Sequence, residues 1–191
     1  IRDFRWVDLS IVMQSALNAL NPLMTIGDHF IDTIQQHRKV SRAESLDLAR
    51  ALIEQVRLPP RVIDSHPHML SGGMRQRVCI ALALALEPKL VILDECTTAL
   101  DVIVEREILD EMIALREKMG FAILAITHDL PLLAEIADRV AIMADGKIVE
   151  IASVDAFRKG GQHPECQRLL AELPNVTGPI RETLLQRKAL K

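Results

Sequence analysis

Two apolar runs of the sequence end in side chains that could bind a cation and activate water. The run Leu90–Leu93 leads directly into Asp94 and Glu95, and His128 stands two residues beyond the run that ends at Ile126. A carboxylate oxygen suits a hard cation that keeps several waters, such as Mg²⁺, and a second carboxylate can polarise an attacking water. Taken alone, the two acids also fit a charged strand end in a solvated turn, and a single histidine there is often structural.

A further candidate is the tripeptide Ser71, Gly72 and Gly73, which leads into an expected helix. Backbone N–H groups and the positive end of the helix dipole favour an anion at such a point. Glycine lets the backbone approach a ligand closely. The same tripeptide would also serve as a plain N-cap with a flexible lead-in, so on its own it leaves both interpretations open.

The elements that would position these residues alternate between strands and helices. Continuous apolar runs at 90–93 and 121–126 are typical of parallel strands covered on both faces. The order of elements predicts an α/β domain with a parallel sheet, whose ligands bind beyond the carboxyl ends of the strands. We expect strands at 9–13, 90–93, 121–126, 140–143 and 147–151, and helices within 26–57, at 74–86, 102–118 and 130–137, and in the tail beyond 153.

Several local signals fix where these elements begin and end. Ser41 with Glu44 three residues later has the spacing of a capping box, and Gly120 is a natural residue to end the helix before it. Residues 66–70 are expected to form a polar loop, and the pair at 145–146 is a hairpin turn signal.

The composition is that of an ordinary globular protein, with 49% hydrophobic and 26% charged residues. The net charge is −3 and the basic residues are dispersed, which argues against a nucleic-acid partner. The longest apolar run, Val78–Leu86, is too short to span a bilayer. Three cysteines without CxxC spacing predict reduced intracellular thiols, at Cys79, Cys96 and Cys166.

Taken in chain order, five motifs resemble those of the ATP-binding-cassette (ABC) ATPases over about residues 5 to 175. The motifs are similar to the Q-loop (Gln14), the signature motif (Leu70–Met74), the Walker B strand (Leu90–Glu95), the D-loop (Thr98–Asp101) and the switch histidine segment (Ile126–Asp129). The resemblance implies a P-loop NTPase-like parallel sheet with a helical subdomain.

The resemblance also implies a division of the chain and a branch of the family. The parts would be residues 1–14, the end of the N-terminal core with the Q-loop; 15–87, the helical subdomain and signature motif; 88–152, the catalytic core; and 153–191, a helical tail. Three stretches are similar to the oligopeptide/dipeptide and nickel importer branch: Ala19–Pro22, Ser71–Val78 and His163–Pro174.

ATP and Mg²⁺ are the ligands that the resemblance implies. Asp94 would hold Mg²⁺ through water, and Gln14 would approach both the metal and the attacking water. Glu95 would polarise that water, and His128 would contact the γ-phosphate. Such a site works mainly by positioning and charge stabilisation.

The remaining implied roles involve partners. Ser71, Gly72 and Gly73 would bind the γ-phosphate of a nucleotide held by a second ATPase subunit, in a homo- or heterodimer, and Asp101 would act across that interface. Integral membrane permeases would dock on the dimer, with a solute-binding protein as an indirect partner. The chain would sit peripherally on the cytoplasmic face of the inner or plasma membrane and energise uptake of oligopeptides, dipeptides or a related solute.

Two features depart from the family pattern. Cys96 stands where a proline usually follows the Walker B glutamate. No P-loop of the form G-x-x-x-x-G-K-[ST] occurs, because of the eight glycines only Gly146 precedes a lysine, and Ile148 follows. We therefore expect the C-terminal two-thirds of a cassette, which lacks the N-terminal strands and P-loop, is not competent alone and exposes apolar strand edges.

Two other functions remain open at this stage. One is an ABC ATPase without a transporter, although such proteins usually carry two cassettes or long insertions. The other is a non-catalytic module that lends only its signature face to a partner's site, which would have no need of Asp94, Glu95 and His128.

Overall fold

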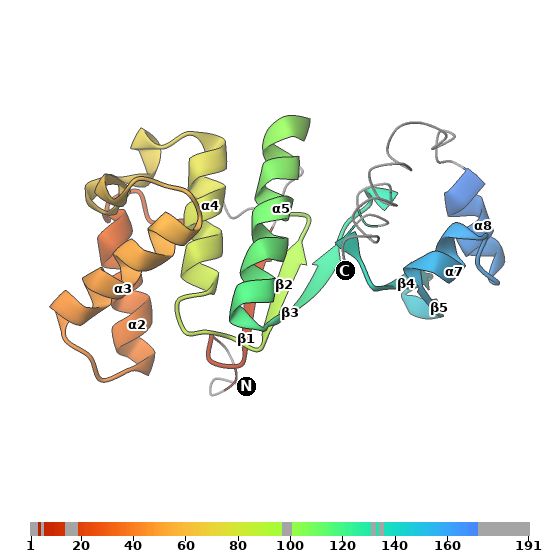
Figure 1. Ribbon diagram of the computed structural model, residues 1–191, viewed down its shortest axis with the longest axis horizontal. Coiled ribbons are helices and arrows are strands. Elements are labelled where there is room, and N and C mark those ends of the chain that lie inside the picture. The colour runs from red at the N-terminus through yellow and green to blue at the C-terminus, as the bar shows by residue number, and fades with distance from the viewer. Residues whose placement is uncertain are drawn as a thin grey trace. The chain divides into compact units, whose positions relative to one another are not determined.

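The structure is a computed structural model that describes residues 4, 6–13, 19–96, 101–130, 133 and 136–171. The chain divides into two compact units, Ile1–Ile126 and Thr127–Lys191, and each is described by itself (Figure 1).

The first unit is built on a three-stranded parallel sheet. Its strands are β1 (Leu9–Met13), β2 (Leu90–Asp94) and β3 (Ala122–Ile126), in the order β1-β2-β3. The central strand β2 is parallel to both neighbours. The predicted α/β class and all three strand positions are therefore confirmed, since each observed strand lies within one residue of its expected bounds.

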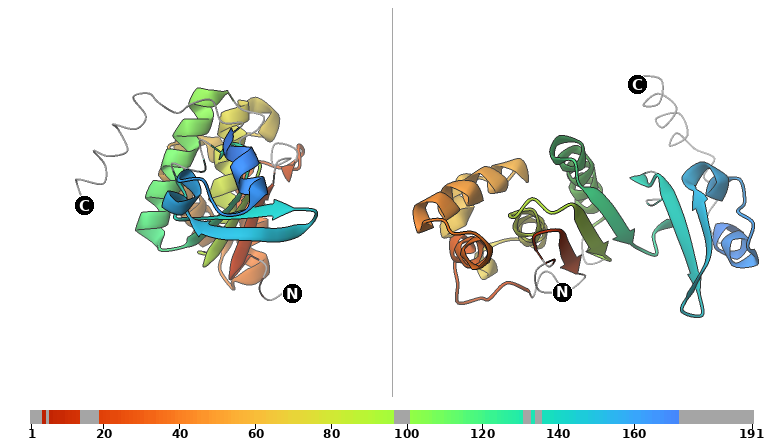
Figure 2. Two further views of the ribbon diagram at one scale, coloured as in Figure 1. Left: turned by 90° about the vertical axis from the view of Figure 1, so that its right-hand side faces the viewer. Right: turned by 90° about the horizontal axis from the view of Figure 1, so that it is seen from below.

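The two faces of this sheet differ in what covers them. The inward face is buried and includes Val12, Val91 and Leu93, which join the main hydrophobic core. The outward face carries Leu124 and Ile126, which are 50% and 49% exposed. The prediction that the strands are covered on both faces is wrong, because α4 and α5 lie along one face only (Figure 2).

The first two helices described in the first unit are α2 (Ile26–His37) and α3 (Arg42–Gln55). Two short 3₁₀ helices follow them, η1 (Pro60–Asp64) and η2 (Pro67–Met69). The predicted capping box is present. The Ser41 N–H donates to the Glu44 carboxylate at 2.7 Å, and the Glu44 N–H donates to the Ser41 hydroxyl at 3.2 Å. The Ser41 hydroxyl also donates to the Glu44 carboxylate, and this bond, together with that from the Ser41 N–H, lowers the pKa of Glu44. The loop expected at 66–70 is instead mostly the turn η2, because Pro67 has the fixed φ that suits a first helical position.

Helix α4 (Gly72–Ala83) is almost entirely buried beyond Arg77, as its apolar sequence predicts. It ends three residues before the expected position, since Leu84 caps it and Glu87 adopts a left-handed φ of 56°. Helix α5 (Val102–Met119) ends at Gly120, whose φ of 77° confirms the predicted glycine cap.

The second unit contains an antiparallel hairpin, β4 (Arg139–Ala144) and β5 (Lys147–Ser153), followed by α7 (Val154–Arg158) and α8 (Pro164–Ala171). The predicted turn is confirmed by left-handed φ values at Asp145 and Gly146. The expectation that residues 140–143 continue the parallel sheet is wrong. The tight turn pairs β4 with its neighbour in sequence, and the two strands form a separate sheet.

Some expected features lie outside the described residues. These are Gln14, the D-loop residues 98–100, parts of the helix expected at 130–137, and the tail beyond 171.

The outward sheet face generates a prediction about self-association. Leu124→Thr keeps a residue that favours strands but removes exposed apolar surface, so we expect less concentration-dependent association by light scattering and little change in stability. Val91→Ala on the buried face is the matched change, because Val91 is 0% exposed. It should lower the free energy of unfolding by about 2 kcal/mol. Equal association of Leu124→Thr and the parent chain would contradict this interpretation of the face.

Candidate functional site

The carboxyl ends of the three parallel strands lie in register at one edge of the sheet. Met13 on β1, Asp94 on β2 and Ile126 on β3 are direct neighbours across the ladder. Asp94 therefore sits at the middle of the edge where ligands bind in open parallel sheets. Its neighbour in sequence, Glu95, continues from the same strand, so both predicted acids belong to this edge.

Glu95 is held in an uncommon backbone conformation. Its φ is 44°, in the left-handed region, which costs a non-glycine residue about 1–3 kcal/mol. Its N–H donates to the Ile126 carbonyl at 2.9 Å, which continues the parallel ladder between β2 and β3 beyond Asp94. Strain of this kind persists only where surrounding structure enforces it, and it gathers at functional sites. The strained backbone position therefore comes directly after the last residue of β2, Asp94.

Two other residues predicted for this edge are not among the described residues of the first unit. Gln14 directly follows Met13 but lies outside the described residues. His128 belongs to the second unit, where its carbonyl accepts from the Leu130 N–H at 3.1 Å. The described edge therefore contains the two carboxylates, and the roles of Gln14 and His128 stay predictions.

Cys96 is part of the hydrophobic core rather than of the reactive edge. Its side chain is buried, and burial raises the pKa of the thiol to about 11. A thiol with so high a pKa is a poor nucleophile at neutral pH. Burial likewise raises the pKa of Cys79, to about 12. These residues act as small apolar side chains.

The N-terminus of α4 has the geometry of an anion site. Ser71 is the N-cap, and its hydroxyl accepts from the Met74 N–H at 3.3 Å. The first backbone bond of the helix runs from the Arg75 N–H to the Ser71 carbonyl, at 3.0 Å. The amides of Gly72 and Gly73 precede that bond, and first-turn amides have no acceptor within an α-helix. They are therefore suited to donate to an oxyanion, as is the O–H of Ser71, whose oxygen accepts from Met74.

Gly73 has a second reason to be glycine, which sequence reasoning missed. A Cβ atom added to it would lie 2.8 Å from Cγ1 of Val104, at the first turn of α5. The two helices approach each other closely at this point, so Gly73 is required for packing as well as for backbone access. An observer with the sequence alone has no signal for this contact, because Val104 is 31 residues away.

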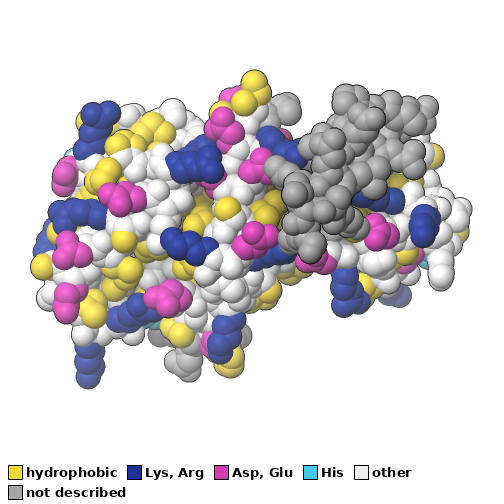
Figure 3. Space-filling model, viewed as in Figure 1, with side chains coloured by type: hydrophobic (Ala, Val, Ile, Leu, Met, Phe, Trp, Pro, Cys, Tyr) yellow, Lys and Arg dark blue, Asp and Glu magenta, His cyan; other side chains and the backbone are white. Residues whose placement is uncertain are grey.

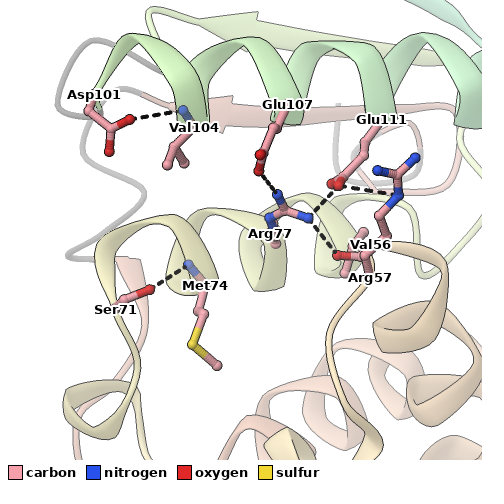
Figure 4. A network of polar contacts seen from close by, with 9 residues as sticks. All are labelled: Val56, Arg57, Ser71, Met74, Arg77, Asp101, Val104, Glu107 and Glu111. Atoms are coloured by element: carbon pink, nitrogen blue, oxygen red, sulfur yellow. Dashed lines mark hydrogen bonds and ion pairs between the residues drawn. The ribbon is translucent and has the colours of Figure 1, made fainter.

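Asp101 is the N-cap of α5, and its carboxylate accepts from the Val104 N–H at 3.0 Å. Figure 4 shows this cap and the Ser71 cap at the beginnings of the two neighbouring helices. The position of Asp101 is thus set by a local bond. Its implied action across a dimer interface remains a prediction.

Arg77 is a partly buried residue for which sequence reasoning found no role. It lies one turn beyond Gly73 on α4 and contacts Glu107 and Glu111 of α5 (Figure 4). The one available signal was an arginine at the start of an otherwise apolar helix segment.

The distribution of charged side chains and of possible metal ligands bears on which ligands the site could bind. Acidic and basic side chains are interspersed over the face shown in Figure 3, with no patch of one sign. Among the residues that the structure describes, no group of three or more His, Cys, Asp and Glu side chains could hold a metal ion. A cation at Asp94 would therefore complete its coordination with water or with ligand oxygens. Within the described helices, none is long and apolar enough to cross a bilayer.

The Gly73 contact gives a stability prediction that needs no ligand. Gly73→Ala should lower the free energy of unfolding by about 1–3 kcal/mol, because the new methyl group overpacks against Val104. Val104→Ala removes the opposing methyl groups. The double variant should therefore lose less free energy of unfolding than the two single variants lose together. Urea unfolding of the four chains measures this coupling energy. If the losses in free energy of unfolding were additive, the side chains at positions 73 and 104 would not be in contact.

The comparisons with known proteins agree with this geometry. The family profile described as "ABC transporter" matches residues 3–98. The glutathione import ATP-binding protein GsiA of Escherichia coli O1:K1 is 40% identical over 178 residues, which are 92% of this chain and 29% of that protein. GsiA of Salmonella choleraesuis (strain SC-B67) is 40% identical over 190 residues, which are 98% of this chain and 30% of that protein. The chain thus spans less than a third of the curated relatives it matches.

Solved structures give the same family. The chain superposes on the dimeric, post-hydrolysis ATP-binding cassette MJ0796 bound to ADP and Pi with a TM-score of 0.69 and 27% identity, over 80% of this chain and 66% of that one. A second dimeric structure of MJ0796, described as a bacterial ABC transporter cassette, gives a TM-score of 0.68 and 28% identity over the same shares. The chain belongs to the ABC transporter family, and its fold is that of the family's ATP-binding cassettes.

Proposed function

We propose that the chain is part of the ATP-binding and ATP-hydrolysing subunit of an ABC importer that takes up peptides or a related solute. Family membership supports the nucleotide chemistry, and the relatives named for glutathione import support an importer. Because glutathione is itself a short peptide, these names agree with the oligopeptide/dipeptide branch that residues 19–22 and 71–78 resemble.

The observation that carries the proposal is the placement of Glu95. It follows the central strand at the carboxyl edge in a left-handed backbone conformation, and its N–H donates to the Ile126 carbonyl at the end of β3. A carboxylate fixed at this edge is suited to accept a proton from water as the water attacks a phosphorus atom bound beside Asp94. In that reaction a bond forms between the water oxygen and the γ-phosphorus, and the bond to ADP breaks.

Mg²⁺ fits the donor set at this edge. Asp94 would hold it, with Gln14 as a second oxygen donor, and nucleotide phosphates and waters would supply the remaining ligands. When bound, the metal would neutralise charge on the β- and γ-phosphate oxygens. His128 would hydrogen-bond the γ-phosphate.

The anion site at the N-terminus of α4 would serve a second subunit. Ser71, Gly72 and Gly73 would bind the γ-phosphate of a nucleotide held mainly by that subunit, and Asp101 would contact the partner across the interface. The dimeric cassettes that this fold matches support such an arrangement. Permease subunits would hold the dimer at the cytoplasmic face of the membrane, with a solute-binding protein acting through them.

The 191-residue chain provides a direct test of its own competence. Because its sequence contains no G-x-x-x-x-G-K-[ST] loop, we expect weak ATP binding and negligible turnover. Isothermal titration and a phosphate-release assay on the purified chain measure both. Turnover of about 1 per second, in the range of ordinary enzymes, would show that this chain holds the phosphates by other means.

The catalytic role of Glu95 is tested in a chain extended through the coding sequence immediately upstream of Ile1. If that sequence supplies a P-loop, we expect Mg²⁺-dependent ATPase activity. Glu95→Gln should then lower kcat by about 100-fold or more, as loss of a general base does, while ATP binding persists. Glu105→Gln on α5 is the control and should keep the parent kcat. Full activity of Glu95→Gln would contradict the proposed role.

A further inference from the structure

Arg77 joins three helices through one partly buried guanidinium. Its Nη1 donates to the Glu111 carboxylate on α5 and to the Val56 carbonyl at the end of α3, the latter at 3.4 Å. Its Nη2 donates to Glu107 at 3.0 Å. Only 12% of the Arg77 side chain and 6% of the Glu111 side chain are exposed. Figure 4 shows the guanidinium between α4 and α5 with its acceptors around it.

The geometry of these bonds restricts how α4 can move on α5. Glu107 and Glu111 are four residues apart, so they lie one turn from each other on the same side of α5. A planar guanidinium that donates to both fixes the sliding and the rotation of one helix along the other. Arg57, just beyond α3, forms a second ion pair with Glu111, since its Nε lies 3.5 Å from the same Glu111 oxygen.

A buried ion pair of this kind is poorly explained by stability alone. Burial raises the pKa of Glu111 even though Arg77 and Arg57 both oppose that shift. Desolvation of the charges therefore offsets much of their attraction, and apolar side chains of similar size would often stabilise a fold as well or better. What directed charge pairs add is a defined arrangement of the elements that carry them.

The arrangement defined here includes the anion site. Gly73 and Arg77 are one turn apart on α4, and they meet Val104 and Glu107 on α5. The helices are thus joined at their first turns by close packing and one turn further by charge. Their N-caps, Ser71 and Asp101, begin these same two helices.

We propose that Arg77 is a positioning residue that makes the N-termini of α4 and α5 a single rigid element. The signature amides and Asp101 then approach a partner subunit in one fixed relation rather than independently. This inference rests on the proposed function for its use in a dimer, but the rigid pairing itself is a property of the first unit.

The test compares amide hydrogen exchange by NMR in the 191-residue chain and its variants, without nucleotide. The reporters are the Met74 and Val104 amides, which bond to the two N-cap side chains. Arg77→Met should speed exchange at both by about tenfold relative to amides of α2, since opening becomes local. Arg77→Lys keeps the positive charge but loses the planar guanidinium that donates to both glutamates. It should likewise speed exchange at the Met74 and Val104 amides.

The control is Ile53→Val, in a buried position of α3, with urea added until its stability equals that of Arg77→Met. It should speed exchange throughout the first unit, without preference for the two reporters. If Arg77→Met gives this uniform pattern, or if Arg77→Lys exchanges like the parent chain, the positioning role is wrong. Should Arg77→Met not fold, Glu107→Ala removes one acceptor at a half-exposed site and should give a smaller acceleration at the same two amides.

A second readout separates this inference from the proposed function. In an extended chain that hydrolyses ATP, Arg77→Lys should lower kcat several-fold and leave KM unchanged. If the extended chain has no ATPase activity, the proposed function fails, while the exchange pattern still decides whether Arg77 couples the helices.

Discussion

The central strand β2 is the element around which the first unit is arranged. It pairs with β1 on one side and β3 on the other, and Val91 and Leu93 carry its inward face into the core. Pairing on both sides fixes its register, which sets Leu93 beside Val12 of β1 and Asp94 beside Ile126 of β3. That register determines where Asp94 lies at the carboxyl edge, and Glu95 follows it in a left-handed backbone conformation.

The second level of organisation is the contact between α4 and α5. Helix α5 follows β2 in the chain and returns over the inward face, where Ile108 and Met112 join the core. Helix α4 brings its glycine-rich start to the same end of α5. The carboxylates and the anion site thus come from different elements, yet both are positioned by packing on one sheet. The carboxylates at the sheet edge and the anion site at the start of α4 are thus two separate sites on the same domain.

Much of this arrangement could be predicted from local signals. The strand bounds, the Ser41–Glu44 capping box, the Gly120 cap and the turn at Asp145–Gly146 each depend on a few neighbouring residues, and all are confirmed. The burial of the strands could not be predicted in this way, since apolar composition does not tell which helices are present to cover each face. Likewise β4 was expected in the parallel sheet, because its hydrophobic pattern is the same whichever strand it pairs with.

In the candidate site too, features that depend on local sequence could be predicted and long-range contacts could not. Asp94 and Glu95 were found because they follow an apolar strand, and Ser71 to Gly73 because glycines precede a helix. The contacts of Gly73 with Val104 and of Arg77 with α5 were missed, because each joins residues about 30 positions apart. Only the folded chain brings such residues together.

The close approach of Gly73 to Val104 has a consequence for reading variation in this family. If a side chain at position 73 must displace one at position 104, the two positions are not free to drift independently. A lineage that acquires alanine at the first should carry a smaller residue at the second. Loss of activity caused by a change at Gly73 then has two separable origins, one in the phosphate contact and one in the fit of two helices, and the residue found at position 104 distinguishes them.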